Sequence, residues 1–177
     1  MTIMNLKNKY NMNTTTTILN HNQIGQKIKR MAYQIYEANS SENEIIIAGI
    51  QGNGIFFAKE LVKYLQKISS LKIILCEVYI DKKNPLGEVS TNISKDLYKN
   101  KSIVLVDDVL NSGTTLMYGV KFFLEVPLKR FKTAVLVNRN HKKYPVKADF
   151  KGISLSTSTK EHVEVSFNKN SSKAFLM

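Results

Sequence analysis

The sequence has few of the features that mark secreted, thiolate-metal or membrane proteins. It holds a single cysteine among 177 residues, Cys76, which excludes an intramolecular disulfide and a thiolate metal cluster. Because Cys76 ends the apolar run 73–76, we expect a buried core thiol on a strand. No apolar run approaches the roughly 20 residues that cross a bilayer, and residues 1–17 carry Asn and Thr where a signal peptide needs an apolar segment. These absences predict a soluble, cytoplasmic protein without a membrane partner.

Acidic residues are also scarce. The chain has 14 Asp and Glu residues against 26 Lys and Arg residues, which gives a formal net charge of +12 at pH 7. So positive a surface attracts phosphate groups, whether they belong to nucleotides, nucleic acid or membranes. The lysines are scattered along the chain instead of forming one block, so solubility explains the excess equally well. The charge therefore indicates phosphate ligands without choosing among their carriers.

The length fits one domain with a small appendage. At 177 residues, with 43% apolar and 23% charged residues, the chain can bury a core but is short for two domains. Residues 1–20 have low complexity, with four consecutive threonines at 14–17, and predict a flexible N-terminal arm. Residues 21–177 then form the single folded domain.

Helical and strand patterns alternate through the middle of the chain. From residue 22 to residue 38 an apolar side chain recurs every three or four positions, as on one face of an amphipathic helix, and the β-branched run 44–50 suits a strand buried on both faces. Further helices are expected at 55–67 and 113–125, and further strands at 72–80, 101–106 and 133–137. Consecutive βα units predict an α/β fold, with a central, mostly parallel sheet flanked by helices on both faces. After Asn138, the short segments 146–150 and 162–167 suggest a small hood at the chain ends instead of another βα unit.

The most informative segment is residues 103–115, an apolar strand that ends in two carboxylates, a short polar loop and a helix start. A loop that enters a helix N-terminus presents unpaired N–H groups and the positive end of the helix dipole to a phosphate dianion. Gly113 lets the backbone approach such a ligand closely. Asp107 and Asp108 can accept hydrogen bonds from ribose hydroxyls or hold a hydrated Mg²⁺ through water. The segment predicts a phosphate and a sugar bound side by side, and the simpler alternative is a helix cap beside two solvated aspartates.

This segment resembles a known family. Four apolar residues, Asp-Asp, an apolar pair and a small polar loop ending in Gly-Thr-Thr resemble the signature of type I phosphoribosyltransferases for 5-phosphoribosyl-1-pyrophosphate (PRPP). The resemblance implies the fold of that family, transfer of a phosphoribosyl group to a nucleobase, Mg²⁺ as cofactor, and a homodimer or higher homo-oligomer. It makes Asp107 and Asp108 the catalytic residues, which would hold the ribose hydroxyls. The 5′-phosphate would be wrapped by Val109, Leu110, Asn111, Ser112, Gly113, Thr114 and Thr115.

A second segment follows a buried strand and precedes a helix, where the family places its pyrophosphate loop. The resemblance assigns the pyrophosphate to Gln51, Gly52, Asn53 and Gly54. This segment is not a Walker loop, because it lacks Gly-Lys-Ser/Thr. It is not a full dinucleotide fingerprint either, because Phe57 occupies the position of the last small residue. The family commonly carries an Arg or Lys in this loop, and here none is present, so a tight turn without a ligand is the alternative.

A third segment, residues 134–152, is similar to one branch of the family, the bifunctional pyrimidine operon attenuator/uracil phosphoribosyltransferases. In that branch a Val-Asp-Arg-Gly-His segment leads through a Pro to an Ala-Asp-aromatic turn, and here Asn138 and Asn140 replace the Asp and the Gly. The resemblance extends over residues 20–165 and implies uracil as the base. It places Val137, Asn138 and Arg139 near that base.

The polar stretch 81–100 is long for a connection inside a compact domain. It has the position of the family's flexible lid, which closes over PRPP to exclude water. Lys82, Lys83 and Lys95 can supply charge against a pyrophosphate, but the usual Arg beside acidic residues is missing. A catalytic lid and a surface loop are therefore equal alternatives.

Two other functions compete with that of an enzyme. The first is a nucleotide-sensing, RNA-binding regulator of transcription attenuation, whose phosphate contacts would make binding strongly dependent on salt. The basic residues that would contact RNA are Lys27, Lys29, Arg30, Arg139, His141 and Lys142. The second is a degenerate family member that keeps the nucleotide site but has lost turnover, as the altered pyrophosphate loop and lid suggest.

Overall fold

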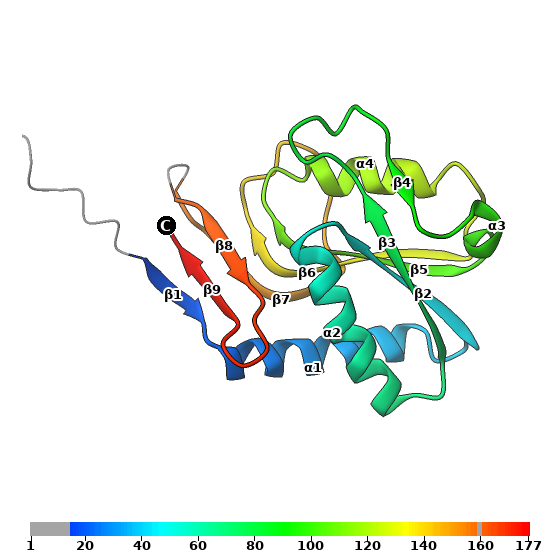
Figure 1. Ribbon diagram of the computed structural model, residues 1–177, viewed down its shortest axis with the longest axis horizontal. Coiled ribbons are helices and arrows are strands. Elements are labelled where there is room, and N and C mark those ends of the chain that lie inside the picture. The colour runs from blue at the N-terminus through cyan, green and yellow to red at the C-terminus, as the bar shows by residue number, and fades with distance from the viewer. Residues whose placement is uncertain (1–14, 159–160) are drawn as a thin grey trace, which may run out of the picture.

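The computed structural model describes residues 15–158 and 161–177, which fold into two sheets and four helices (Figure 1). The helices are α1 (His21–Ala38), α2 (Asn53–Ile68), α3 (Lys95–Tyr98) and α4 (Thr114–Phe123). The strands are β1 (Thr16–Leu19), β2 (Glu44–Ile50), β3 (Lys72–Tyr79), β4 (Ser90–Thr91), β5 (Ser102–Leu110), β6 (Arg130–Arg139), β7 (Phe150–Leu155), β8 (Val163–Ser166) and β9 (Lys173–Leu176). None of the helices in this described part is long and apolar enough to cross a membrane.

A six-stranded sheet forms the centre of the fold, with the strand order β4-β3-β2-β5-β6-β7. Five of these strands run parallel, and the two-residue β4 pairs antiparallel with the end of β3. The β-branched run of β2 is buried on both faces, since Ile45, Ile46 and Ile47 are all 0% exposed. The predicted α/β architecture with a central, mostly parallel sheet is confirmed.

Helices cover both faces of this sheet. α1 and α2 pack together on one face, while α3 and α4 lie on the other (Figure 1). The apolar positions that predicted α1 all point into the core, and they are Ile24, Ile28, Met31 and Ile35. The helix begins one residue earlier than predicted because Asn20 caps it: the Asn20 Oδ1 accepts the Gln23 N–H at 3.0 Å, and the Gln23 Oε1 accepts the Asn20 N–H at 2.9 Å.

The stretch 81–100 is held in place over its second half. β4 pairs with Val78 and Tyr79, and α3 buries Tyr98 completely against two phenylalanine rings of α4, with the closer ring centroid, that of Phe123, at 5.1 Å. Only the connection from residue 80 to residue 89 is therefore free of regular structure between β3 and β4. The aromatic packing of Tyr98 anchors the part that follows β4, and the alternatives of a lid and a surface loop stay open for the part before it.

The segment after Asn138 departs from the prediction. β7 joins the central sheet as a sixth strand, parallel to β6, instead of forming part of a hood. Its connection from β6 contains no helix, and Gly152 lies so close to the Leu136 carbonyl that a Cβ at this position would overlap it. The β7 pattern was hard to recognise because an edge strand alternates buried and half-exposed residues and lacks a continuous apolar run.

The two ends of the described chain form a small three-stranded antiparallel sheet in the order β1-β9-β8, the hood (Figure 1). This corrects the C-terminal end of the expected arm: Thr16–Leu19 is a strand, and Leu19 is only 3% exposed because it packs on the core beside α1. Residues 1–14 of that arm lie outside the described residues.

Candidate functional site

The two turns that the sequence singled out lie at one edge of the central sheet. β2 and β5 are parallel neighbours, so the turn after β2 and the end of β5 emerge side by side. Gly54, in the first turn of α2, is tightly packed there: a Cβ at this residue would lie 3.0 Å from the Val106 carbonyl oxygen and 3.2 Å from the Asp107 Oδ1. A glycine at position 54 thus allows α2 to start directly against the carboxylates of β5.

Asp107 and Asp108 form a nearly buried acid pair, with exposed fractions of 4% and 8%. The Asp108 N–H donates to the Asp107 Oδ1 at 3.0 Å, and the Asn53 side-chain amide donates to the Asp108 Oδ2 at 3.1 Å. The Lys82 Nζ lies 3.0 Å from the Asp107 Oδ1 and 3.7 Å from the Asp108 Oδ1. Within residues 15–158 and 161–177, the pair thus contacts one cation and one side-chain amide, which follow the ends of β3 and β2.

The burial of the acid pair shifts the pKa values of Asp107 and Lys82. Burial and, next to it, the charge of Asp108 raise the pKa of Asp107, Lys82 opposes both effects, and the net result is a pKa of about 7. Burial would lower the pKa of Lys82, yet the fields of the two carboxylates outweigh it and raise that pKa. The site thus holds a carboxyl whose charge is costly without an additional cation or hydrogen-bond donors.

The polar loop after β5 has the form of a phosphate cradle. Gly113 has φ 82°, in the left-handed region, and α4 begins at the next residue. The hydroxyls of Ser112 and Thr114 lie 2.9 Å apart, and the Thr114 N–H points to the Ser112 Oγ at 3.3 Å. No acceptor among the described residues takes the N–H of Ser112, Gly113 or Thr115, so these groups are free for an anion at the positive end of α4. The loop lines a small cavity of about 50 Å³ that Asp107 also borders.

The cradle is supported from behind by the connection between β6 and β7. The backbone N–H groups of Lys143 and Tyr144 donate to the Ser112 carbonyl at 2.8 and 3.2 Å. The Val146 side chain packs so closely beneath Gly113 that a Cβ at Gly113 would overlap it. The segment of residues 134–152 therefore supports the shape of the polar loop after β5.

The turn assigned to pyrophosphate carries no positive charge, and its polar side chains are already engaged. The Gln51 N–H donates to the Val78 carbonyl at 2.8 Å, and the Gln51 side-chain amide donates to the Ile80 carbonyl. The Asn53 amide is shared between Asp108 and the Val165 carbonyl of β8, the latter at 2.7 Å. The turn thus ties the end of β3 and the hood to the acid pair.

The residues expected near a base lie at the end of β6 and are buried. Val137 is 0% exposed and Asn138 is 3% exposed; the Asn138 amide nitrogen donates to the Ser154 Oγ at 3.2 Å, while its Oδ1 has no partner among the described residues. Arg139 is also 3% exposed. Its guanidinium donates to the Thr157 Oγ1, the Ser158 carbonyl and the Glu161 carbonyl at 3.0, 3.3 and 2.6 Å. In this structure the Arg139 side chain holds the segment around residues 157–161, and its expected contact with RNA stays a prediction.

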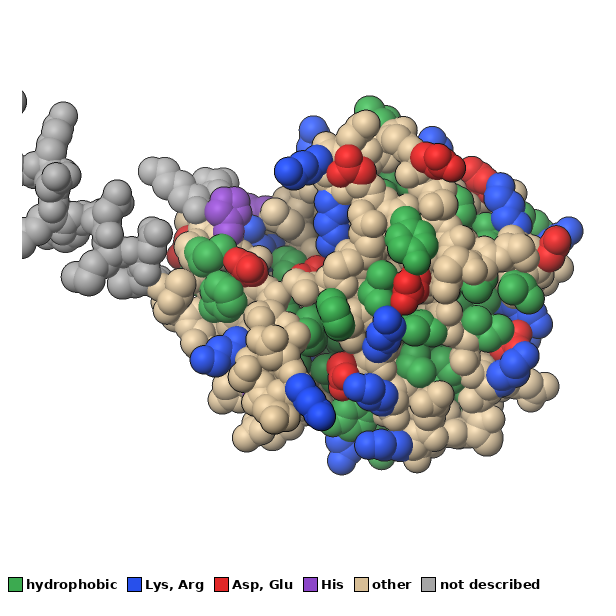
Figure 2. Space-filling model, in the orientation of Figure 1, with side chains coloured by type: hydrophobic (Ala, Val, Ile, Leu, Met, Phe, Trp, Pro, Cys, Tyr) green, Lys and Arg blue, Asp and Glu red, His purple; other side chains and the backbone are tan. Residues whose placement is uncertain are grey.

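The other basic residues expected to touch RNA do not meet at the acid pair. Arg30 binds the edge of the central sheet, where its Nη2 donates to the Lys151 and Gly152 carbonyls at 2.7 and 2.8 Å. The His141 Nε2 contacts the Thr157 carbonyl, whereas Lys29 and Lys142 are exposed and Lys27 is half-buried. On the face shown in Figure 2, Lys and Arg side chains are spread among Asp and Glu side chains and form no single basic block.

Two contacts of the site were missed from the sequence. Lys82 was expected to face a ligand, but its contact with the acid pair was not foreseen, and neither was the link from Asn53 to Asp108. Both residues follow the carboxyl ends of parallel strands, β2 and β3, at the same edge of the sheet as the end of β5, and that placement is the signal that would have found them.

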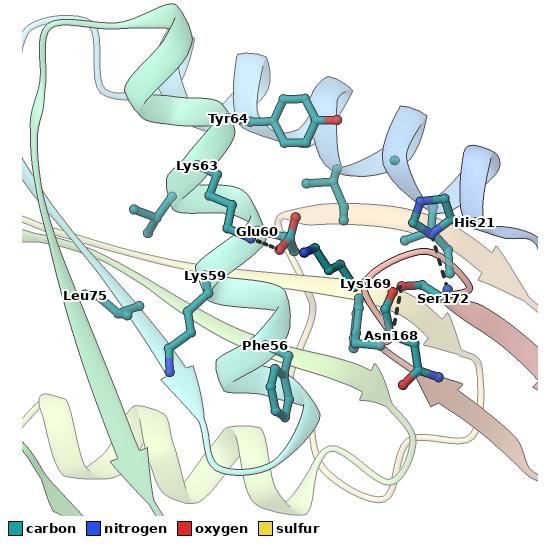
Figure 3. Close-up of a pocket in the computed structure, with 15 residues that line it drawn as sticks. His21, Phe56, Lys59, Glu60, Lys63, Tyr64, Leu75, Asn168, Lys169 and Ser172 are labelled. Carbon is teal, nitrogen blue, oxygen red and sulfur yellow. Dashed lines mark hydrogen bonds and ion pairs between the residues drawn. The ribbon is translucent and has the colours of Figure 1, made fainter.

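A larger cavity lies elsewhere, between α1, α2 and the turn after β8 (Figure 3). Its volume is about 650 Å³, and its wall combines apolar residues such as Phe56 and Leu75 with Lys59, Lys63 and Lys169. It contains none of the residues of the acid pair, the phosphate loop or the Gln51–Gly54 turn. Volume alone would select this cavity, but the reactive groups and the free backbone donors converge at the end of β5.

Comparisons with known proteins match most of the chain. Residues 14–170 match the sequence model of the family described as phosphoribosyl transferase domain. The bifunctional protein PyrR of Caldicellulosiruptor bescii is 34% identical over 157 residues, which cover 84% of this chain and 86% of that protein. The corresponding protein of Bacillus subtilis is 30% identical over 169 residues, covering 89% and 93%.

Solved structures show the same fold at lower identity. The hypoxanthine phosphoribosyltransferase of Trypanosoma cruzi superposes with a TM-score of 0.72 at 15% identity, over 84% of each chain. A hypoxanthine-guanine phosphoribosyltransferase from Bacillus anthracis gives a TM-score of 0.69 at 19% identity, again over 84% of each chain. The predicted type I phosphoribosyltransferase-like fold is confirmed.

The Gly113→Ala variant tests the phosphate loop. Alanine at φ 82° is strained, and its Cβ would overlap Val146, so we expect the loop to shift and the affinity for ribose 5-phosphate to fall at least about tenfold. Isothermal titration calorimetry on folded protein measures this.

The matched control is Gly25→Ala, in the interior of α1, where the nearest atom to the new Cβ is the Tyr64 hydroxyl at 3.9 Å. We expect unchanged affinity and a free energy of unfolding about 0.5–1 kcal/mol higher, as for glycine to alanine in a helix. Equal ligand affinity of Gly113→Ala and wild type would contradict the assignment of the loop.

The raised pKa of Asp107 predicts how stability depends on pH in the absence of ligand and metal. Because the pKa in the folded state, about 7, lies above the ordinary value of 3.8, the folded state binds the proton more tightly and stability falls as pH rises between these values. Wild type should therefore lose stability from pH 5 to pH 8 that Asp107→Asn does not lose. The difference in free energy of unfolding, Asp107→Asn minus wild type, should increase by about 2 to 3 kcal/mol over this range. Urea denaturation at both pH values measures the difference, and parallel profiles would show that Asp107 is not strained.

Proposed function

The chain belongs to the phosphoribosyl transferase domain family, and on that premise we propose that it joins a nucleobase, uracil first, to PRPP with release of pyrophosphate. The observation that carries the proposal is the adjacency of two features at the end of β5. The acid pair Asp107–Asp108 is suited to ribose hydroxyls, and the hydroxyl-rich start of α4 is suited to the 5′-phosphate.

In the proposed complex the 5′-phosphate accepts hydrogen bonds from the free N–H groups and hydroxyls of residues 112–115. The ribose hydroxyls donate to Asp107 and Asp108. The pyrophosphate extends toward the turn Gln51–Gly54, where backbone N–H groups of Gly52 and Asn53 lie at the start of α2. The base lies toward the end of β6, near Val137 and Asn138. Uracil is proposed because residues 134–152 resemble the pyrimidine branch of the family.

Mg²⁺ fits this site only together with the substrate. Asp107 and Asp108 are the acidic groups there, no cluster of three or more metal-ligating side chains occurs among the described residues, and the Lys82 ammonium shows that the pair accepts a cation. Mg²⁺ typically takes one or two carboxylates plus water and phosphate oxygens, so Asp107 and Asp108 would hold it, directly or through water. When bound, it supplies positive charge to the leaving pyrophosphate.

The proposed reaction is an attack of a nucleobase nitrogen on the anomeric carbon of the ribose, and the N–H proton of that nitrogen is released to solvent as the new N–C bond forms. The bond from that carbon to the pyrophosphate oxygen breaks, its electron pair leaves with pyrophosphate, and the sugar passes through an oxocarbenium-like state. The protein contributes mainly by holding the sugar and phosphate in place and by meeting charge with fixed donors.

A cytoplasmic location and a homodimer or larger homo-oligomer belong to the same proposal and come from the sequence and the family resemblance.

The direct test is pyrophosphate release from PRPP and Mg²⁺, with uracil, hypoxanthine, guanine, adenine and orotate offered separately. We expect release with uracil and a fall of about 100-fold or more in Asp108→Asn, because the ribose loses one of its two carboxylates. Release with a different base would correct the substrate. No release with any base from correctly folded protein would reject the enzyme and favour a degenerate nucleotide-binding member.

RNA binding is a second candidate, favoured by two observations. Lys27 and Lys29 project from α1 without an ion pair among the described residues, and the curated relatives are named bifunctional. If this helix binds RNA phosphates, replacing both lysines by Met should reduce the slope of log affinity against log salt by about 1.4 for a mixed-sequence single-stranded RNA of about 20 nucleotides. The control pair Lys99→Met and Lys121→Met, exposed elsewhere, should leave it unchanged. Equal slopes in both double variants would exclude α1 as the RNA site.

A further inference from the structure

The acid pair has a cation of its own. Among the described residues, Lys82 is the one basic residue with a nitrogen within 4 Å of either carboxylate, at 3.0 Å from the Asp107 Oδ1 and 3.7 Å from the Asp108 Oδ1. Two adjacent carboxylates with exposed fractions of 4% and 8% need such a partner, because burying unpaired charge is costly. In the ligand-free protein Lys82 therefore occupies the position that ribose hydroxyls and a metal would need.

The turn that would bind pyrophosphate has no cation of its own. Gln51 uses its side-chain amide on the Ile80 carbonyl, and Asn53 uses its amide on Asp108 and the Val165 carbonyl. Backbone N–H groups alone must then meet the multiple negative charges of a pyrophosphate. A nearby lysine that can move is the remaining source of full positive charge.

Lys82 is placed to serve both the acid pair and that turn. It lies two residues past Ile80, which is buried and held by the Gln51 amide, so the base of its loop is fixed beside the turn. Its side chain is 42% exposed, so the stem can swing while the backbone stays in place. Because Asn53 bridges the turn to Asp108 over 3.1 Å, the two destinations of the ammonium are adjacent.

We propose that Lys82 is a substrate-binding residue that neutralises Asp107 and Asp108 in the free protein. When the ribose hydroxyls bind these two carboxylates, the Lys82 side chain moves and its ammonium forms an ion pair with the pyrophosphate of PRPP. The inference rests on the proposed function. One lysine then has two roles. It balances the charge of the acid pair when no ligand is bound, and it supplies the positive charge that the turn Gln51–Gly54 lacks when PRPP is bound.

The neighbouring lysines of the same stretch do not share this role. Lys95 pairs with Glu125 on the far side of the sheet. Lys83 is exposed, forms no ion pair among the described residues and contacts Asp81 through its backbone N–H at 2.8 Å. Lys83→Met is thus a matched control, since it removes the same charge from the adjacent position of the same loop.

The experiment compares two ligands that differ by the pyrophosphate, PRPP and ribose 5-phosphate, by calorimetry with Mg²⁺ and without a nucleobase. In Lys82→Met, PRPP should bind about 10- to 100-fold more weakly, as expected for loss of a charge-assisted hydrogen bond, while ribose 5-phosphate should bind equally or more tightly. Lys82→Arg should keep PRPP affinity within about fivefold of wild type, and Lys83→Met should keep both affinities within about twofold.

A metal measurement without substrate tests the other half of the proposal. Because Lys82 and a divalent cation compete for the same carboxylates, Lys82→Met should bind Mn²⁺ at least about threefold more tightly than wild type, as read by Mn²⁺ paramagnetic resonance. Unchanged Mn²⁺ affinity would overturn the counter-charge role.

The outcomes separate this inference from the function on which it rests. If wild type binds neither ligand, the proposed function fails. If wild type binds both, and folded Lys82→Met loses affinity for both equally or for neither, the function stands and the role of Lys82 is overturned. The proposed movement of the Lys82 ammonium to pyrophosphate is supported if Lys82→Met binds PRPP more weakly but keeps its affinity for ribose 5-phosphate, while Lys83→Met keeps its affinity for both ligands.

Discussion

The burial of two adjacent carboxylates at the end of β5 is the constraint on which the rest of the site depends. Asp107 and Asp108 are held almost out of water, and burial together with their mutual repulsion raises the pKa of Asp107 to about 7. A protein keeps such a pair only if other groups supply positive charge or donors. Here they come from Lys82 after β3 and Asn53 after β2, so three parallel strands contribute to one cluster.

The same cluster links the two sheets of the molecule. Asn53 donates to Asp108 and also to the Val165 carbonyl of β8, and Phe57, one helical turn later, stacks on Phe167 with ring centroids 6.1 Å apart. The hood is therefore fixed to the start of α2 by an amide and an aromatic contact. A ligand that binds Asp108 in place of Asn53 would change the contacts of the hood as well as those of the site. The position of the small sheet at this edge thus links it to ligand binding.

Much of the fold and the centre of the site could be predicted from the sequence because both depend on local patterns. The β-branched run of β2 and the helical spacing in α1 each report a buried face directly, and the order strand, Asp-Asp, polar loop, helix by itself predicts a loop at a helix start that suits a phosphate. What could not be predicted depends on residues far apart in the chain. β7 is an edge strand with a mixed pattern, β1 pairs with β9 from the other end of the chain, and Arg139 is buried by a segment about twenty residues later. Lys82, which follows β3, reaches Asp107 on β5 across the strand β2 that lies between them, which no single stretch of sequence records.

A crystal structure of the protein with PRPP and Mg²⁺ tests the central claim most directly, because two sites compete to be the functional one. The account predicts the 5′-phosphate within hydrogen-bonding distance of the N–H groups and hydroxyls of residues 112–115, with the ribose hydroxyls on Asp107 and Asp108. Ligand density in the cavity between α1 and α2, with Lys82 still on an empty acid pair, would contradict it.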